Sequence, residues 1–215
     1  MDLTLYGYWR SSCSWRVRIA LNLKGLSHAN VPVHLVKDGG EQHSDAHRVR
    51  NPMRELPVLL VGDQPLAQSM AILEYLEEAH PTPALLPADP VDRARVRQMA
   101  ELINSGIQPI QNLRVMQKLG RDFQLEKART MAWSHDWIEA GFVALDQLIA
   151  RHGGRYSFGD IITFADLCLI PQIYNARRFS VDLDRFPRLL QIEKALDEHP
   201  AFVAAKPSNQ PDAVS

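Results

Sequence analysis

The stretch that decides the fold is WRSSCSWRVRIAL, residues 9–21. It follows the apolar run Leu3–Tyr8, which is typical of a short β-strand. Ser11 or Ser12 suits the N-cap of a helix, and apolar residues then recur at positions 13, 17, 20 and 21, on one face at helical spacing. The sequence therefore predicts a strand, a polar turn and a helix whose start carries serines and a thiol.

The residues after this helix complete a small α/β domain. Apolar residues alternate between His28 and Val36, and this second strand ends at the turn signal 38–40. A compact strand at 57–61 and a short one at 65–67 predict a hairpin, and Ser69 is expected to cap the helix that follows. Together these elements form a βαβ–ββα unit, which we assign to residues 1–80.

Prolines separate this unit from the rest of the chain. Four of them fall between Pro81 and Pro90, so residues 81–90 are expected to form a linker. Residues 91–215 are expected to form an all-helical domain, because the chain from 91 to 151 has a single proline and little β-branched alternation. The predicted fold class is thus α/β followed by all-α, in two domains.

Three further features belong to the second half. Thr163 and Asp166 have the spacing of a capping box, so we expect them to begin a helix rather than to act in catalysis. Trp133, Trp137 and Phe142 have rough helical spacing and are expected to pack in the core. The polar tail, residues 207–215, is expected to be frayed.

Composition excludes several classes of function. The net charge of −1 over 215 residues gives no basic field for nucleic acid. No apolar run approaches the about 18 residues of a membrane helix, and the N-terminus lacks a signal-peptide pattern. Two cysteines are too few for a disulfide framework, which favours a reducing, cytoplasmic location. His43 and His47 are four residues apart but have no obvious third ligand, so no metal site is expected.

The run 11–21 resembles the signature of the zeta class of glutathione S-transferases, which includes maleylacetoacetate and maleylpyruvate isomerases. Further matches lie in both halves of the chain: Lys37–Gly40, Asn51–Met53, Gln68–Ser69, Gln108–Leu113 and Asn175–Phe179. The resemblance implies a thioredoxin-like glutathione-binding domain followed by an all-helical substrate domain. It also implies a homodimer.

The helix start can favour a bound thiolate, because its unpaired N–H groups and dipole attract an anion. By resemblance, Ser11 donates a hydrogen bond to the glutathione thiolate, while Ser12 and Cys13 line the same spot. From residue type alone, one serine is an N-cap and the other is part of the loop. Cys13 is expected to lie near the substrate rather than to be the obligatory nucleophile, because glutathione supplies the thiol.

Further cofactor contacts are implied by the resemblance. Leu56 presents its backbone to the cysteinyl part of glutathione through a cis peptide bond to Pro57. The other implied contacts are Gln42 at the glycyl end, Gln68 and Ser69 at the γ-glutamyl carboxylate, and the amides of Gln108 and Asn112.

The implied substrates are dianions, which planar guanidinium groups bind well. Arg10 and Arg178 match the family's active-site arginines, and Arg114 and Gln111 are added as substrate-binding candidates. The implied reaction is a glutathione-dependent cis–trans isomerisation of a maleyl ketoacid, with maleylacetoacetate placed before maleylpyruvate. A general glutathione transferase acting on α-halo acids stays open as an alternative. A non-catalytic assembly module is disfavoured by the intact Ser11 cluster.

Overall fold

The computed structural model describes residues 2–213, which divide into two compact units. The first unit contains the chain up to Ala84 together with the segment from Asp197 onward, and the second is Leu85–Leu196. The boundary between Ala84 and Leu85 lies inside the expected linker 81–90. The expected second domain, residues 91–215, differs from this division at its end, because the last helix packs on the first unit.

A four-stranded sheet forms the centre of the first unit, in the order β2-β1-β3-β4. Its strands are β1 (Leu3–Gly7), β2 (Ala29–Pro32), β3 (Val58–Val61) and β4 (Gln64–Ala67). β1 runs parallel to β2 and antiparallel to β3, and β3 and β4 form the predicted hairpin. The βαβ–ββα order predicted from the sequence is therefore confirmed.

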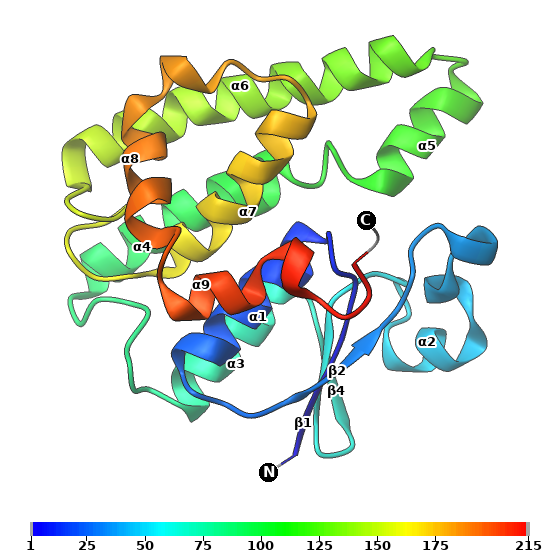
Figure 1. The fold of residues 1–215 in the computed structure, drawn as a ribbon, viewed down its shortest axis with the longest axis horizontal. Coiled ribbons are helices and arrows are strands. Elements are labelled where there is room, and N and C mark those ends of the chain that lie inside the picture. Colours follow the sequence, from blue (N-terminus) through cyan, green and yellow to red (C-terminus); the bar gives the residue numbers. More distant parts are fainter. Residues whose placement is uncertain (1, 214–215) are drawn as a thin grey trace. The chain divides into compact units, whose positions relative to one another are not determined.

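Helices cover both faces of this sheet. The main ones are α1 (Ser12–Leu23), α2 (Asp45–Arg50) and α3 (Ser69–Ala79), and two short 3₁₀ turns, η1 (Lys37–Gly39) and η2 (Glu41–His43), precede α2. Figure 1 shows α1 and α3 on one side of the strands and α2 on the other. The core between sheet and helices is apolar and contains Val17, Ile19, Leu59, Ile72 and Leu73, all fully buried.

A buried ion pair joins the ends of α1 and α3. The ammonium of Lys24, the C-cap residue of α1, lies 2.9 Å from a carboxylate oxygen of Glu77 on α3. The same ammonium donates to the carbonyl oxygens of His80, at 2.7 Å, and Pro83, at 2.9 Å. Lys24 thereby fixes the chain where it leaves α3.

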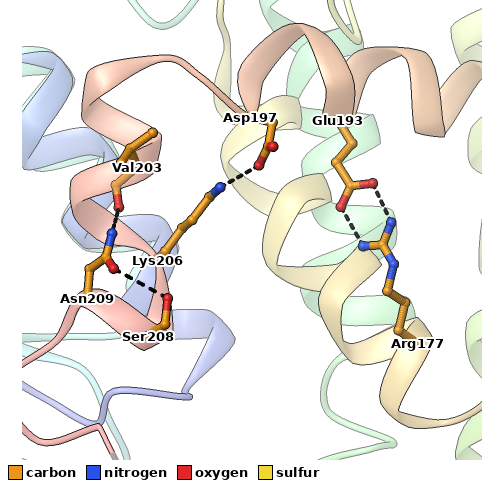
Figure 2. Close-up of polar contacts among 7 residues, drawn as sticks. All are labelled: Arg177, Glu193, Asp197, Val203, Lys206, Ser208 and Asn209. Atoms are coloured by element: carbon orange, nitrogen blue, oxygen red, sulfur yellow. Dashed lines mark hydrogen bonds and ion pairs between the residues drawn. The ribbon is translucent and has the colours of Figure 1, made fainter.

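The C-terminal segment returns to the first unit. Helix α9 (Pro200–Ala205) packs on α1, and the turn η5 (Pro207–Asn209) follows it. Asn209 donates to the Val203 carbonyl at 2.7 Å (Figure 2), and the Gln210 amide donates to the carbonyls of Ala204 and Lys206, both at 2.9 Å. The expectation of a frayed tail is wrong for residues 207–212, because side chains hold this backbone; residues 214 and 215 lie outside the described residues.

The second unit is helical, as predicted. It contains α4 (Pro90–Glu101), a π-helical turn η3 (Leu102–Ile107), α5 (Leu113–Asp122), α6 (Lys127–His152), α7 (Phe164–Arg178), the turn η4 (Leu183–Arg185) and α8 (Pro187–Leu196). Helix α7 lies at its centre, since nearly all of its residues are buried. No helix within residues 2–213 is long and apolar enough to cross a membrane.

The predicted capping box begins α7. The buried carboxylate of Asp166 accepts from the backbone N–H of Thr163 at 2.8 Å and from its hydroxyl at 3.2 Å. The other carboxylate oxygen accepts from the N–H of Ser157, also at 2.8 Å. Burial raises the pKa of Asp166, and these hydrogen bonds oppose the rise. Thr163 therefore has a structural role, as its spacing predicted.

The expected core series on α6 is only partly correct. Phe142 is fully buried, but Trp133 and Trp137 are 38% and 43% exposed. Their rings lie 6.1 Å apart, and the Trp133 indole N–H donates to the Ile110 carbonyl at 3.3 Å. The prediction that both tryptophans are core residues is wrong.

Candidate active site

The start of α1 is built around the Ser11 hydroxyl. Ser11 is the N-cap, and its oxygen accepts from the backbone N–H of Ser14 at 3.2 Å. A hydroxyl has one hydrogen to donate besides its lone pairs, so Ser11 retains a donor for an anion in front of the helix. The first turn of α1 carries no acidic side chain that would neutralise the positive end of the helix dipole.

The neighbouring predicted residues lie at the same helix start. Ser12 is buried, whereas Cys13 is half-buried. Arg10, also half-buried, lies with its guanidinium carbon 5.1 Å from the centre of the Trp9 ring. The chain thus brings Arg10, Ser11, Ser12 and Cys13 together in one turn of backbone.

A second helix start, that of α3, carries Gln68 and Ser69. Gln68 is the N-cap with a positive φ of 69°, and Ser69 is the first residue of the helix, so the expectation that Ser69 caps α3 is wrong. The buried Ser69 hydroxyl accepts from the guanidinium of Arg16 on α1 at 3.4 Å. This helix start also lacks an acidic side chain in its first turn, which leaves it suited to a carboxylate.

The loop before β3 has the expected cis peptide bond between Leu56 and Pro57. Just before it, the Glu55 carbonyl accepts from two buried side chains, the ring of His47 at 3.1 Å and the amide of Asn51 at 3.0 Å. Burial lowers the pKa of His47; the hydrogen bond to Glu55 opposes this and the charge of Arg50 adds to it. The neutral form of His47 is therefore favoured, and in this form the ring holds the loop through its hydrogen bond to the Glu55 carbonyl.

Gln42 is buried within its own loop. Its amide nitrogen lies 3.2 Å from the Leu35 carbonyl and 3.1 Å from the Nε2 atom of His43. Gly40, with a φ of 106°, is needed beside it, because a side chain there would come within 2.5 Å of the Gln42 amide. Among residues 2–213, no group of three or more His, Cys, Asp or Glu side chains is arranged to hold a metal ion.

In the second unit, four predicted residues lie between the end of η3 and the first turn of α5. Asn112 is the N-cap of α5, and its side-chain oxygen accepts from the Arg114 N–H at 3.1 Å. Gln111 is buried and exchanges two hydrogen bonds with Gln172 of α7, at 2.7 and 3.3 Å. Gln108 is half-buried and Arg114 is exposed. The Gln111–Gln172 pair joins this segment to the helix that carries Arg178.

The two adjacent arginines at the end of α7 differ in their partners. Arg177 forms a bidentate ion pair with Glu193 of α8, with both N–O distances at 2.5 Å (Figure 2). Arg178 donates to the neutral amide oxygen of Asn175 at 3.2 Å and lies 5.8 Å from the centre of the Phe179 ring.

Several residues that support these positions could not be found by spacing. Arg16, His47 and Gln172 each contact a predicted site residue or its loop. The one signal in the sequence was the pair of arginines, Arg16 and Arg18, placed among the buried apolar residues of α1.

A thioredoxin-like unit with a cis-proline and a hydroxyl at a helix start, joined to a helical unit, defines a protein of the glutathione transferase type. The family model for the glutathione S-transferase N-terminal domain matches residues 1–78, and the one for the C-terminal domain matches residues 114–204. Maleylacetoacetate isomerase of Rattus norvegicus is 49% identical over 208 residues, which cover 97% of this chain and 94% of the rat protein. Maleylpyruvate isomerase of a Ralstonia species is 47% identical, with 98% and 100% covered.

The chain is also similar to solved structures of maleylpyruvate and maleylacetoacetate isomerases. A holo structure described as maleyl pyruvate isomerase, a bacterial zeta-class transferase, has a TM-score of 0.95 and 46% identity, with 98% of this chain and 100% of that one covered. Maleylacetoacetate isomerase from Anaeromyxobacter dehalogenans, with glutathione in its active site, has a TM-score of 0.89 and 46% identity, with 99% and 98% covered. The chain belongs to the glutathione S-transferase family, in the zeta-class group of maleylacetoacetate and maleylpyruvate isomerases.

Proposed function

We propose that this protein is a glutathione-dependent cis–trans isomerase of maleyl ketoacids, converting maleylacetoacetate to fumarylacetoacetate. The observation that carries the proposal is the start of α1, where Ser11 caps the helix and keeps a hydroxyl hydrogen for an anion. The similarity to isomerases named for this substrate, at 44–49% identity, supports the same reaction.

The residues present fit glutathione. Two helix starts without acidic side chains, those of α1 and α3, suit its thiolate and its γ-glutamyl carboxylate. At α3 the Ser69 hydroxyl is backed by the guanidinium of Arg16. Gln68 would hold the γ-glutamyl end with Ser69, the backbone of Leu56 the cysteinyl part, and Gln42 the glycyl end. Gln108 and Asn112 would add amides.

Each group of this chain has a defined task in the reaction. When bound, glutathione supplies the reversible nucleophile that makes a cis double bond rotatable. Ser11 and the positive end of α1 lower the pKa of an anion-forming thiol placed there. Arg10, Arg178 and Arg114 bind the two carboxylates of the ketoacid, and their charges stabilise the negative charge that develops on its ketone oxygen. Gln111, whose amide is held by Gln172, would add an amide contact to the ketoacid.

Maleylpyruvate is the second candidate substrate. Its carboxylates are closer together, which favours a site with a third cation such as the exposed Arg114, and the Ralstonia relative carries that name. A general transferase acting on α-halo acids would share the thiol site but would not need three substrate arginines.

The proposal includes a cytoplasmic location and a homodimer. Both cysteines are free thiols, which suits a reducing compartment. Exposed apolar side chains of the second unit, Phe123 at 64%, Trp133 and Trp137, offer surface for a second copy. Sedimentation analysis would show a dimer mass; a monomer at micromolar concentration would contradict this part.

The test follows the ultraviolet absorbance of maleylacetoacetate and maleylpyruvate in parallel, each with and without glutathione. We expect glutathione-dependent conversion of both, faster for maleylacetoacetate. Arg178→Ala should raise the KM for the ketoacid, whereas Arg177→Ala, its matched control, should not. Bound glutathione without conversion of either ketoacid, together with turnover of chloroacids, would replace the isomerase proposal with the general transferase.

A further inference from the structure

The backbone just before the candidate thiol site is held from two sides. The N–H of Trp9 donates to a carboxylate oxygen of Asp212 at 3.0 Å. The guanidinium of Arg18 donates to the Trp9 carbonyl at 2.9 Å and to the Tyr8 carbonyl at 3.4 Å. Both polar groups of the Trp9 main chain are therefore bound by charged side chains, one residue before Arg10 and two before Ser11.

Arg18 also binds the end of α9. It is 4% exposed, and its Nε and Nη2 atoms donate to the Ala205 carbonyl at 3.2 and 3.1 Å. Burial lowers the pKa of Arg18 to about 10, and the charge of Asp212 opposes the fall. Arg18 is therefore a cation at neutral pH, and the Asp212 carboxylate is its counter-charge.

The position of Asp212 does not depend on Trp9 alone. Its own segment is fixed by the hydrogen bonds of Asn209 and Gln210 to the α9 region (Figure 2 shows the one from Asn209). The backbone that carries Asp212 is therefore fixed by its own hydrogen bonds, so the Asp212 carboxylate can hold the Trp9 N–H in place.

We propose that Asp212 and Arg18 are positioning residues, which hold the Tyr8–Trp9 backbone and through it the side chains of Arg10 and Ser11. The inference rests on the proposed function, in which Ser11 serves the thiol and Arg10 the ketoacid. The physical reason is that Trp9 lies between β1 and α1, where no strand or helix hydrogen bonds hold its backbone. A misplacement of about 1 Å at such a site can lower the rate on the order of 100-fold.

The test compares Asp212→Ala and Asp212→Asn with Asp197→Asn. The alanine variant removes both charge and acceptor, whereas the asparagine variant keeps an oxygen for the Trp9 N–H and removes only the charge. The matched control, Asp197→Asn, loses the ion pair with Lys206 in the same segment but does not touch Trp9. Circular dichroism shows whether each variant is folded, and the isosteric asparagine variant is decisive if the alanine variant is not.

Five quantities are measured: hydrogen exchange of the Trp9 amide, the glutathione Kd by calorimetry without ketoacid, the pKa of the bound thiol by its thiolate absorbance, kcat and KM. We expect Asp212→Ala to speed Trp9 exchange, to raise the thiol pKa, and to weaken glutathione binding and kcat/KM about 10- to 100-fold. Asp212→Asn should give values between those of Asp212→Ala and those of the unsubstituted protein. Asp197→Asn should keep its glutathione Kd and kcat/KM within about twofold of the unsubstituted protein.

The outcomes separate the two proposals. An unsubstituted protein that neither binds glutathione nor converts a ketoacid would overturn the proposed function, and with it the positioning role of Asp212 and Arg18. If the unsubstituted protein is active and Asp212→Ala matches Asp197→Asn in glutathione Kd, thiol pKa and kcat/KM, the positioning role is overturned and the proposed function stands.

Discussion

Replacing Lys24 tests how the first unit is held together. Its fully buried ammonium has three acceptors, the carboxylate of Glu77 and the carbonyls of His80 and Pro83. Lys24→Met keeps most of the side-chain volume but leaves the Glu77 carboxylate buried without this counter-ion. Breaking a buried pair from one side typically costs about 3–5 kcal/mol, so we expect a loss of that size in the free energy of unfolding.

The double variant Lys24→Met/Glu77→Leu separates the charge effect from lost packing. Because it removes both charges, it should be more stable than Lys24→Met alone, with a coupling free energy of up to about 3 kcal/mol. Urea unfolding followed by circular dichroism and tryptophan fluorescence gives these values. Arg48→Met, which breaks the exposed pair with Asp45, is the control and should cost less than about 1 kcal/mol.

Two results would refute this reasoning. One is a loss for Lys24→Met no larger than that of the Arg48→Met control. The other is a double variant whose loss equals the sum of the losses measured for Lys24→Met and for Glu77→Leu singly, since additivity would mean that the two charges do not interact.

The remaining predictions concern the loop before β3, the capping box and the thiol site. Burial lowers the pKa of His47 below its ordinary 6.5, so the unfolded state takes up the proton first as pH falls. The melting temperature of the unsubstituted protein should therefore decrease as pH falls below about 6.5, and that of His47→Gln should decrease less steeply. Parallel plots of melting temperature against pH for the two proteins would disprove this. Asp166→Ala removes the acceptor of two buried N–H groups, at about 1–3 kcal/mol each, and should lower the free energy of urea unfolding by about 2–6 kcal/mol; a loss under about 1 kcal/mol would contradict it. Ser11→Ala should lower the free energy of unfolding by about 1 kcal/mol, because the N-cap is lost, and should raise the pKa of the bound glutathione thiol, measured by thiolate absorbance. Cys13→Ser should keep its turnover. Loss of turnover in Cys13→Ser with an unchanged thiol pKa in Ser11→Ala would make Cys13 the nucleophile.

Local signals in the sequence were sufficient for the elements themselves. The start of α1 followed from a serine next to an apolar helical repeat, and Ser11 is its N-cap. The capping box of α7 followed from the Thr163–Asp166 spacing. Both features depend on atoms a few residues apart, so their geometry is written in the local sequence.

Contacts between distant positions could not be predicted in this way. Ser69 was expected to cap α3, but its hydroxyl faces Arg16, 53 residues earlier, and Gln68 is the N-cap. The pairing of the Gln111 amide with Gln172 has no local signal either, because only tertiary packing brings the two residues together. Helical spacing also does not say which stripe of a long helix is buried, which is why Trp133 and Trp137 were misplaced.

The return of α9 to α1 has a consequence for how the protein is made. A ribosome delivers α1 before the second unit and α9 after it, so the first unit waits for all of Leu85–Leu196 before its last helix can dock. During that interval the α1 surface that α9 covers is open to other proteins. The unit that emerges first is the one completed last, and a nascent chain halted before Pro200 would leave that surface of α1 without α9.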